Sequence, residues 1–131
     1  KAGSGHLINV SSIVGRRGIP YRSAYSATKF ALVGLTESLR VELKGTGVHV
    51  SLVYPIYTAT EFHDVEIHRA ESIHRGPVQS AEQVARAIVR CARRPRSEVY
   101  PFPPARILAL LSVLAPGFVD WMIYRFSRRS R

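Results

Sequence analysis

Cysteine is almost absent from this chain: Cys91 is the only one in 131 residues. A single cysteine excludes an internal disulfide and any zinc site built from several thiolates. Long apolar runs are also missing, because no stretch approaches the ~20 residues that a membrane-spanning helix needs. We therefore expect a protein of a reducing compartment, by default the cytoplasm.

Acidic residues are scarce as well. Nine Asp and Glu accompany 19 Lys and Arg, so the formal net charge is +10. Such an excess favours anionic partners. The arginines are scattered, however, and no zinc-finger spacing, aromatic RNA-binding strand or recognition helix accompanies them, so we expect no nucleic-acid partner. His63 and His68 lie five residues apart, which fits neither a helical nor a strand pair of ligands, and we expect no metal site.

The first residues lack an initiator methionine and the pattern of a signal peptide. Lys1 to His6 lead directly into an apolar stretch. We therefore interpret the sequence as the C-terminal part of a longer protein. Its 46% hydrophobic and 21% charged residues are typical of a folded domain.

Three successive segments predict a strand, a helix and a second strand. His6–Ser12 is a short apolar run that ends in small polar residues, which is typical of a buried strand. Apolar positions recur at helical spacing from Ser23 to about Leu43. Val48–Tyr54 is rich in β-branched residues and stops at Pro55. This succession predicts the parallel strands of an α/β fold, whose ligands bind beyond the carboxyl ends of the strands.

The second half of the chain is less regular. The stretch from Thr58 to Pro77 has no clear period, and we expect there a mobile loop or short helices that could cover a site. Ser80 to Gln83 form a capping-box pattern, which predicts a helix that runs to about Arg93. Glu98–Tyr100 predict a last short strand.

Ser12, Tyr25 and Lys29 are the strongest candidates for chemistry. Tyr25 and Lys29 are four residues apart, a spacing that places both side chains on one face of a helix. Ser12 closes the strand before that helix. A phenol can act as acid or base, an ammonium beside it lowers its pKa, and a serine hydroxyl can hold the reacting oxygen. The three residues together predict chemistry on a carbonyl or an alcohol.

With these residues placed, the chain resembles the C-terminal half of a short-chain dehydrogenase/reductase, from about Gly5 to Tyr100. The segments Asn9–Ser12, Tyr25–Lys29 and Pro55–Thr60 occur in the order and spacing of that family. The resemblance implies the C-terminal part of a doubly wound, parallel-sheet Rossmann-type fold. It also implies an NAD(P)-dependent oxidoreductase that interconverts a carbonyl and a secondary alcohol by hydride transfer.

The resemblance assigns catalytic roles residue by residue. Ser12 would polarise and orient the substrate oxygen. Tyr25 would donate or accept the proton, and it would bind the substrate together with Ser12. Lys29 would lower the pKa of Tyr25 and hydrogen-bond the ribose hydroxyls of the nicotinamide cofactor.

The cofactor implied by the resemblance is NAD or NADP, with NADP slightly favoured. Besides Tyr25 and Lys29, its contacts would fall on Pro55, Thr58 and Thr60. Ile56 stands where the family usually has a glycine that lets the backbone approach the cofactor. The glycine-rich nucleotide loop and a fourth catalytic residue, an Asn, would precede the first residue of this sequence, so we expect no turnover from these 131 residues alone.

Residues 101–131 predict a Pro-rich hinge and an amphipathic, apolar and basic helical tail, which follows the oxidoreductase part at residues 1–100. Ile107–Ala115 is apolar, Pro116 interrupts it, and Trp121 and Tyr124 then stand close to several arginines. Aromatic residues next to arginines suit a helix that lies in a membrane interface. The same side chains suit packing over the substrate pocket or a neighbouring subunit, and the sequence leaves both alternatives open.

The partners we expect follow from these observations. One is a small carbonyl or alcohol substrate, which would be lipophilic if the tail contacts a membrane peripherally. The other is a second copy of the intact protein, because in the resembled family the helix that bears Tyr25 pairs with its symmetry mate. A helix from the missing N-terminal half would cover the same apolar surface equally well, and the sequence leaves both alternatives open. The alternative function is a non-catalytic remnant, or a membrane-associating and oligomerising module. Binding of a nicotinamide cofactor by the intact protein separates the two functions.

Overall fold

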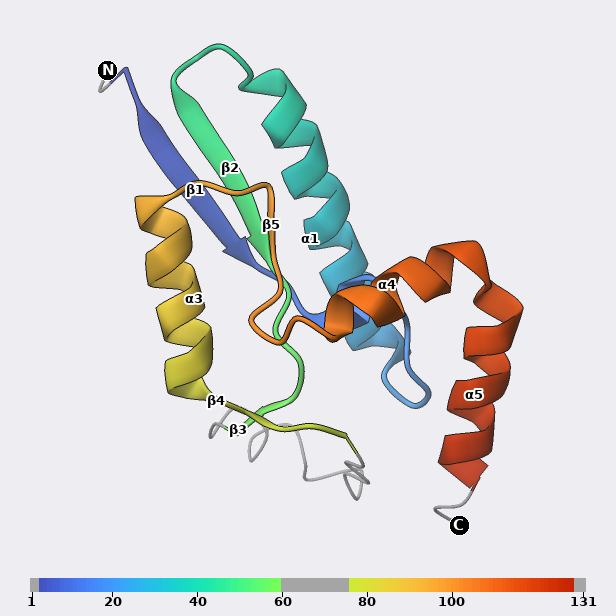
Figure 1. Ribbon diagram of the computed structural model, residues 1–131. Coiled ribbons are helices and arrows are strands. Elements are labelled where there is room, and N and C mark those ends of the chain that lie inside the picture. The colour runs from blue at the N-terminus through green and yellow to red at the C-terminus, as the bar shows by residue number, and fades with distance from the viewer. Residues whose placement is uncertain (1–2, 60–75, 129–131) are drawn as a thin grey trace.

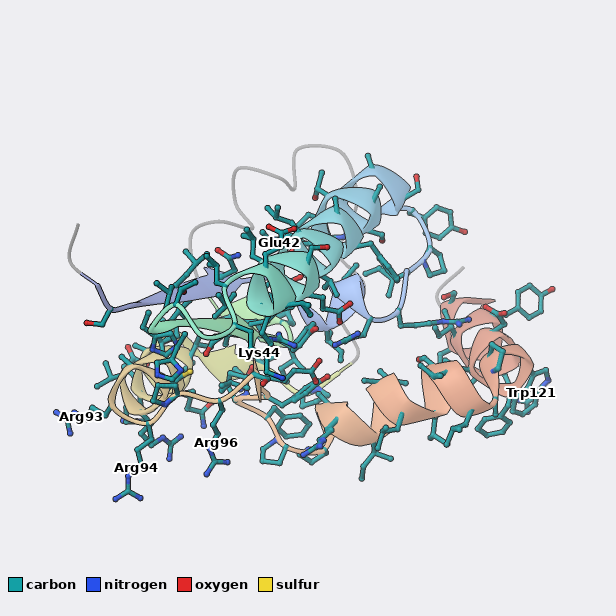
Figure 2. The ribbon with its side chains drawn as sticks, turned by 90° about the horizontal axis from the view of Figure 1, so that it is seen from above. Glu42, Lys44, Arg93, Arg94, Arg96 and Trp121 are labelled. Carbon is teal, nitrogen blue, oxygen red and sulfur yellow. The ribbon has the colours of Figure 1, made fainter. Side chains whose placement is uncertain are left out.

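The computed structural model describes residues 3–59 and 76–128. Its main sheet contains three parallel strands, β1 (Gly5–Val10), β2 (Val48–Val53) and β5 (Glu98–Val99), in the order β1-β2-β5. Helices α1 (Ser23–Glu42) and α3 (Ala81–Arg93) lie on opposite sides of this sheet (Figures 1 and 2). The predicted α/β class and parallel pairing are therefore confirmed.

The core forms between β2 and α1. Along β2 alternate side chains point to opposite faces of the sheet, and Leu52 and, just beyond the strand, Tyr54 pack with Val33 of α1 in one buried cluster. A polar bond fixes the helix to the neighbouring strand, because the side-chain amide of Asn9 donates to the hydroxyl of Thr36 at 2.9 Å. Thr36 is completely buried, so the bond sets the position of α1 across β1.

Helix α3 begins as the sequence predicts. The hydroxyl of Ser80 accepts from the backbone N–H of Gln83, and the side chain of Gln83 accepts from the backbone of Ser80, which completes the capping box. Ala87 and Cys91 form its buried side. The helix that the capping-box pattern predicted, ending at about Arg93, is therefore confirmed.

A second, two-stranded sheet was not predicted. Strand β3 (Thr58–Ala59) pairs in parallel with β4 (Gln79–Ser80) just before α3. We expected no strand here, because two-residue strands are too short to show an alternating pattern. Most of the stretch that the sequence assigned to a covering loop, including His63 and His68, lies outside the described residues.

The C-terminal region forms two helices, α4 (Ala105–Leu114) and α5 (Pro116–Arg128), separated at the predicted break. The division of the chain at residue 100 stays a prediction. Within residues 3–59 and 76–128, no helix combines the length and apolar character needed to cross a bilayer.

Candidate active site

Strand β1 ends at Val10, two residues earlier than the sequence predicted, because Ser12 begins a short 3-10 helix, η1 (Ile13–Gly15). The Ser12 hydroxyl accepts from the backbone N–H of Val14 at 3.2 Å, and a hydroxyl in that role keeps its own proton for donation. Ile13 donates its backbone N–H to the carbonyl of Pro55 at 2.8 Å. Ser12 is therefore buried at the edge where β1 and β2 both end.

Tyr25 and Lys29 lie in the first two turns of α1, which starts at the same edge of the sheet (Figure 1). The Lys29 ammonium is 5.6 Å from the centre of the Tyr25 ring. It also donates to the carbonyl of Val10 at 3.5 Å. Lys29 thus lies between the tyrosine and the end of the strand that leads to Ser12.

Gly15 permits close approach of η1 to α1. A Cβ atom there would lie 2.6 Å from the Ser11 hydroxyl and 2.9 Å from the backbone carbonyl of Lys29. The Ser11 hydroxyl in turn donates to that carbonyl at 3.1 Å. Only a residue without a side chain fits this position, and the resulting contact joins the segment that bears Ser12 to the helix that bears Lys29.

The stretch proposed for cofactor contacts begins at the buried end of β2. Pro55 is buried there, and the backbone N–H of Ile56 donates to the side chain of Gln79 at 3.0 Å. The Thr58 hydroxyl donates to the carbonyl of Ile56 at 3.0 Å. Ile56 is absent from the described residues with positive φ, so an isoleucine in place of glycine causes no backbone strain. Thr60 lies outside the described residues.

The relationship to known proteins agrees with this arrangement. A family model described as short chain dehydrogenase matches residues 1–70, more than half of the chain. The chain belongs to the short chain dehydrogenase family. The predicted C-terminal part of a Rossmann-type fold is confirmed by solved structures of this family that superpose on the chain.

Several relatives match almost the whole sequence. A ketoacyl reductase, HetN, of Nostoc sp. is 32% identical over 95% of this chain and 45% of its own length. The human 17-beta-hydroxysteroid dehydrogenase type 1 is 32% identical over 85% of this chain and 40% of its own. A short chain dehydrogenase from Burkholderia cenocepacia, solved in complex with NADP, superposes with a TM-score of 0.75 at 25% identity, covering 92% of this chain and 47% of that one. The chain thus spans less than half the length of these relatives.

A charged and aromatic cluster anchors η1 of this short chain dehydrogenase. Arg16, the residue after η1, forms ion pairs with Glu37 of α1 at 3.1 Å and with Glu98 of β5. Its guanidinium lies 4.8 Å from the centre of the Tyr54 ring, and that ring stacks on Tyr100 at 4.8 Å. Arg16 therefore connects the turn after Ser12 to a helix and to the far strand of the sheet.

The cluster shifts the pKa of its members. Burial raises the pKa of Tyr54 well above the usual value near 10, although Arg16 opposes the shift. Burial and the nearby Glu98 also raise the pKa of Tyr100. Burial alone would lower the pKa of Arg16, but the negative charges of its partners outweigh burial and raise it. At neutral pH the cluster therefore contains a charged arginine and two neutral phenols.

An open cleft of about 830 Å³ lies beside the loop that precedes α1. One residue of the cleft wall, Asp120 of α5, forms an ion pair with Arg17. The residues that line the cleft come from that loop and from α5 and are Gly18, Pro20, Tyr21, Asp120, Ile123, Tyr124 and Ser127.

Sequence reasoning missed Gln79 and Arg16. Gln79 is buried and binds the backbone beside Pro55 from 23 residues away, and nothing in its local sequence indicates this. In the sequence Arg16 is one of many scattered arginines in loops. Its partner Glu98 is 82 residues away, and only the folded structure brings the two together.

The Gly15 contact predicts opposite effects for two glycines of this region. Gly15→Ala forces a side chain against Lys29 and should lower the free energy of unfolding by about 1–3 kcal/mol. Gly34→Ala is the matched control: Gly34 lies inside α1 with nothing within 4 Å of an added Cβ, and alanine there should raise the free energy of unfolding by up to about 1 kcal/mol. Urea unfolding of the full-length protein measures both, and equal effects would contradict the contact.

The Tyr54 hydroxyl predicts an unusual pH dependence of stability. It is buried and has no hydrogen-bond partner among the described residues, so Tyr54→Phe should change the free energy of unfolding at pH 7 by no more than about 1 kcal/mol. Because the unfolded state loses the Tyr54 proton near pH 10 and the folded state retains it to higher pH, stability should fall as the pH rises above about 10. Denaturant unfolding at several pH values should show that Tyr54→Phe loses less of its free energy of unfolding above about pH 10 than the unaltered protein does. The same loss in both proteins would show that Tyr54 does not cause it.

Proposed function

We propose that the full-length protein is an NAD(P)-dependent oxidoreductase that interconverts a carbonyl compound and a secondary alcohol, with Ser12, Tyr25 and Lys29 as its catalytic residues. One observation carries the proposal. The Lys29 ammonium lies both against the Tyr25 ring and against the carbonyl at the end of β1, two residues before Ser12. This contact supports the proposal, because α/β folds bind their ligands at the carboxyl ends of their strands.

Each residue has a distinct part in the proposed reaction. The Ser12 hydroxyl, kept in place by Val14, donates a hydrogen bond to the oxygen of the substrate. The phenol of Tyr25 gives a proton to that oxygen on reduction and takes it back on oxidation. The positive charge of Lys29 favours the ionised phenol, which makes the proton transfer easier near neutral pH.

The residues present fit a nicotinamide cofactor. Lys29 has three N–H donors and uses one on Val10, so it retains donors for ribose hydroxyls. Pro55 and Thr58 follow the carboxyl end of β2 and would contact the carboxamide, together with Thr60. The cofactor would supply or accept the hydride. Because the Burkholderia cenocepacia relative contains NADP, NADP is the first cofactor to test.

A lipophilic substrate suits the cleft between the Gly18–Tyr21 loop and α5. Pro20, Tyr21, Ile123 and Tyr124 give it a largely apolar wall. The names of two relatives, a ketoacyl reductase and a hydroxysteroid dehydrogenase, also refer to lipophilic carbonyl or alcohol substrates. We extend this class to the present protein as part of the proposal.

The exposed side of α1 supports the expected homo-oligomer. Phe30, Leu35 and Val41 are large apolar residues of this helix that remain exposed. Contact with a second copy would remove them from water, at roughly 25 cal/mol for each Å² of apolar surface.

Replacement of Tyr25 by phenylalanine tests the proposed acid. The variant keeps the ring but loses the proton, so kcat of the full-length enzyme should fall by about 100-fold or more, while the Kd for NADPH stays nearly constant. Tyr100→Phe is the matched control, because it removes a hydroxyl that bonds Glu98 and should retain activity. Normal turnover by Tyr25→Phe would refute the mechanism. Failure of the unaltered protein to bind either NADPH or NADH would favour the non-catalytic alternative.

Replacement of Lys29 by methionine should lower kcat/KM by at least about 100-fold and move the rate maximum to higher pH, because the phenol then ionises less readily. Lys44→Met removes the same charge from an exposed position two residues beyond the end of α1 (Figure 2) and serves as the control. A pH–rate profile of each variant checks the effect. A Lys29→Met profile that matched that of Lys44→Met would exclude Lys29 from catalysis.

A further inference from the structure

Helix α5 has two different faces. Asp120, Ile123, Tyr124 and Ser127 have the spacing of one helical face and line the cleft beside the loop before α1. The ion pair between Asp120 and Arg17 attaches this inner face to the rest of the protein. The inner face of α5 therefore borders the open cleft and is joined to the rest of the chain through Asp120.

The outer face of α5 combines aromatic rings with an arginine. Phe118, Trp121 and Arg125 follow the spacing of the opposite side of the helix. The rings of Phe118 and Trp121 stack at 6.0 Å, and the Arg125 guanidinium lies 5.7 Å from the centre of the Trp121 ring. Both rings are more than half exposed, at 54% and 55%. A preformed unit of two aromatic residues and one cation thus faces away from the protein.

Helix α4 also has one face toward the protein and one exposed face. Ala105 and Ala109 form its buried side. Ile107, Leu110 and Leu114 share the other side at helical spacing, and each is more than half exposed. An exposed apolar stripe of this kind on a soluble protein marks an interaction surface.

The charged residues of α4 and α5 are mainly positive. Asp120 is the only acidic residue within α4 and α5, and Arg17 already neutralises it. Arg106 and Arg125 are exposed cations of the two helices. Figure 2 shows α4, Trp121 and the arginines at positions 93, 94 and 96 along the same side of the molecule. The apolar stripe therefore lies on a side with an excess of positive charge.

We propose that the outer faces of α4 and α5 form a docking surface for a lipid bilayer that contains anionic headgroups. Aromatic and aliphatic side chains of such a surface enter the boundary between headgroups and acyl chains, and arginines beside them pair with phosphate. Two copies of the chain meeting through this surface would bring their arginines together, so the charge favours lipid over self-association. The proposal is independent of the proposed hydride chemistry, because it concerns a different face of α5.

Vesicle sedimentation of the full-length protein tests the docking surface. The protein should bind vesicles of phosphatidylcholine mixed with phosphatidylserine and bind much less to phosphatidylcholine alone, and added salt should weaken binding. The double variant Phe118→Ser/Trp121→Ser should lose roughly tenfold or more of its vesicle affinity. Arg125→Glu should lose on the order of tenfold for the anionic vesicles only.

Two control variants match these changes. Val78→Ser/Val89→Ser removes two exposed apolar side chains elsewhere, and Lys44→Glu reverses one exposed charge two residues beyond the end of α1. Both variants should bind vesicles like the unaltered protein. Equal binding to both vesicle types, or unchanged binding by the Phe118/Trp121 double variant, would overturn the proposal. So would a lipid-free assembly, measured by light scattering, that this double variant dissociates, because the surface would then be an interface between copies.

Discussion

Gly15 lies so close to the backbone carbonyl of Lys29 that a Cβ atom would come within 2.9 Å of it. This contact presses the 3-10 turn after β1 onto the first turns of α1. Ser12 lies three residues before Gly15, on one side of the contact. Tyr25 and Lys29 belong to α1, on the other side of the contact. The position of the serine relative to the tyrosine and lysine depends on this approach, because two backbone segments meet with no side chain between them.

The sheet supplies the second constraint on the site. Parallel pairing of β1 and β2 brings their carboxyl ends to one edge, where the bond from Ile13 to Pro55 joins the two segments that follow. Arg16, the residue after η1, then fixes this turn through its ion pairs with Glu37 and Glu98, whose negative charges keep the guanidinium protonated. The turn is thus held by the strand before it, the helix after it and the far strand of the sheet.

Much of the fold could be predicted from the sequence. The bounds of α1 and α3 followed from apolar periodicity and, for α3, from the capping box formed by Ser80 and Gln83. Strands β1, β2 and β5 were predicted as well. The end of β1 was placed two residues late, because Ser11 and Ser12 resemble a continuation of the strand although Ser12 caps η1. Strands β3 and β4 escaped prediction because a two-residue strand has no period. The spacing of Ser12, Tyr25 and Lys29 indicated carbonyl or alcohol chemistry, the resemblance implied their individual roles, and these roles stay a proposal.

The sequence by itself determined which elements form and which residues carry the candidate chemistry, because helical spacing, β-branched runs and the serine, tyrosine and lysine pattern are local. Only the tertiary structure decided which distant residues support them. Gln79 binds the backbone of Ile56, Arg16 reaches Glu98 across the sheet, and Arg17 attaches α5 through Asp120. These pairs are separated by 23 to 103 residues. Their contacts depend on how strands and helices pack, and no local pattern encodes that geometry.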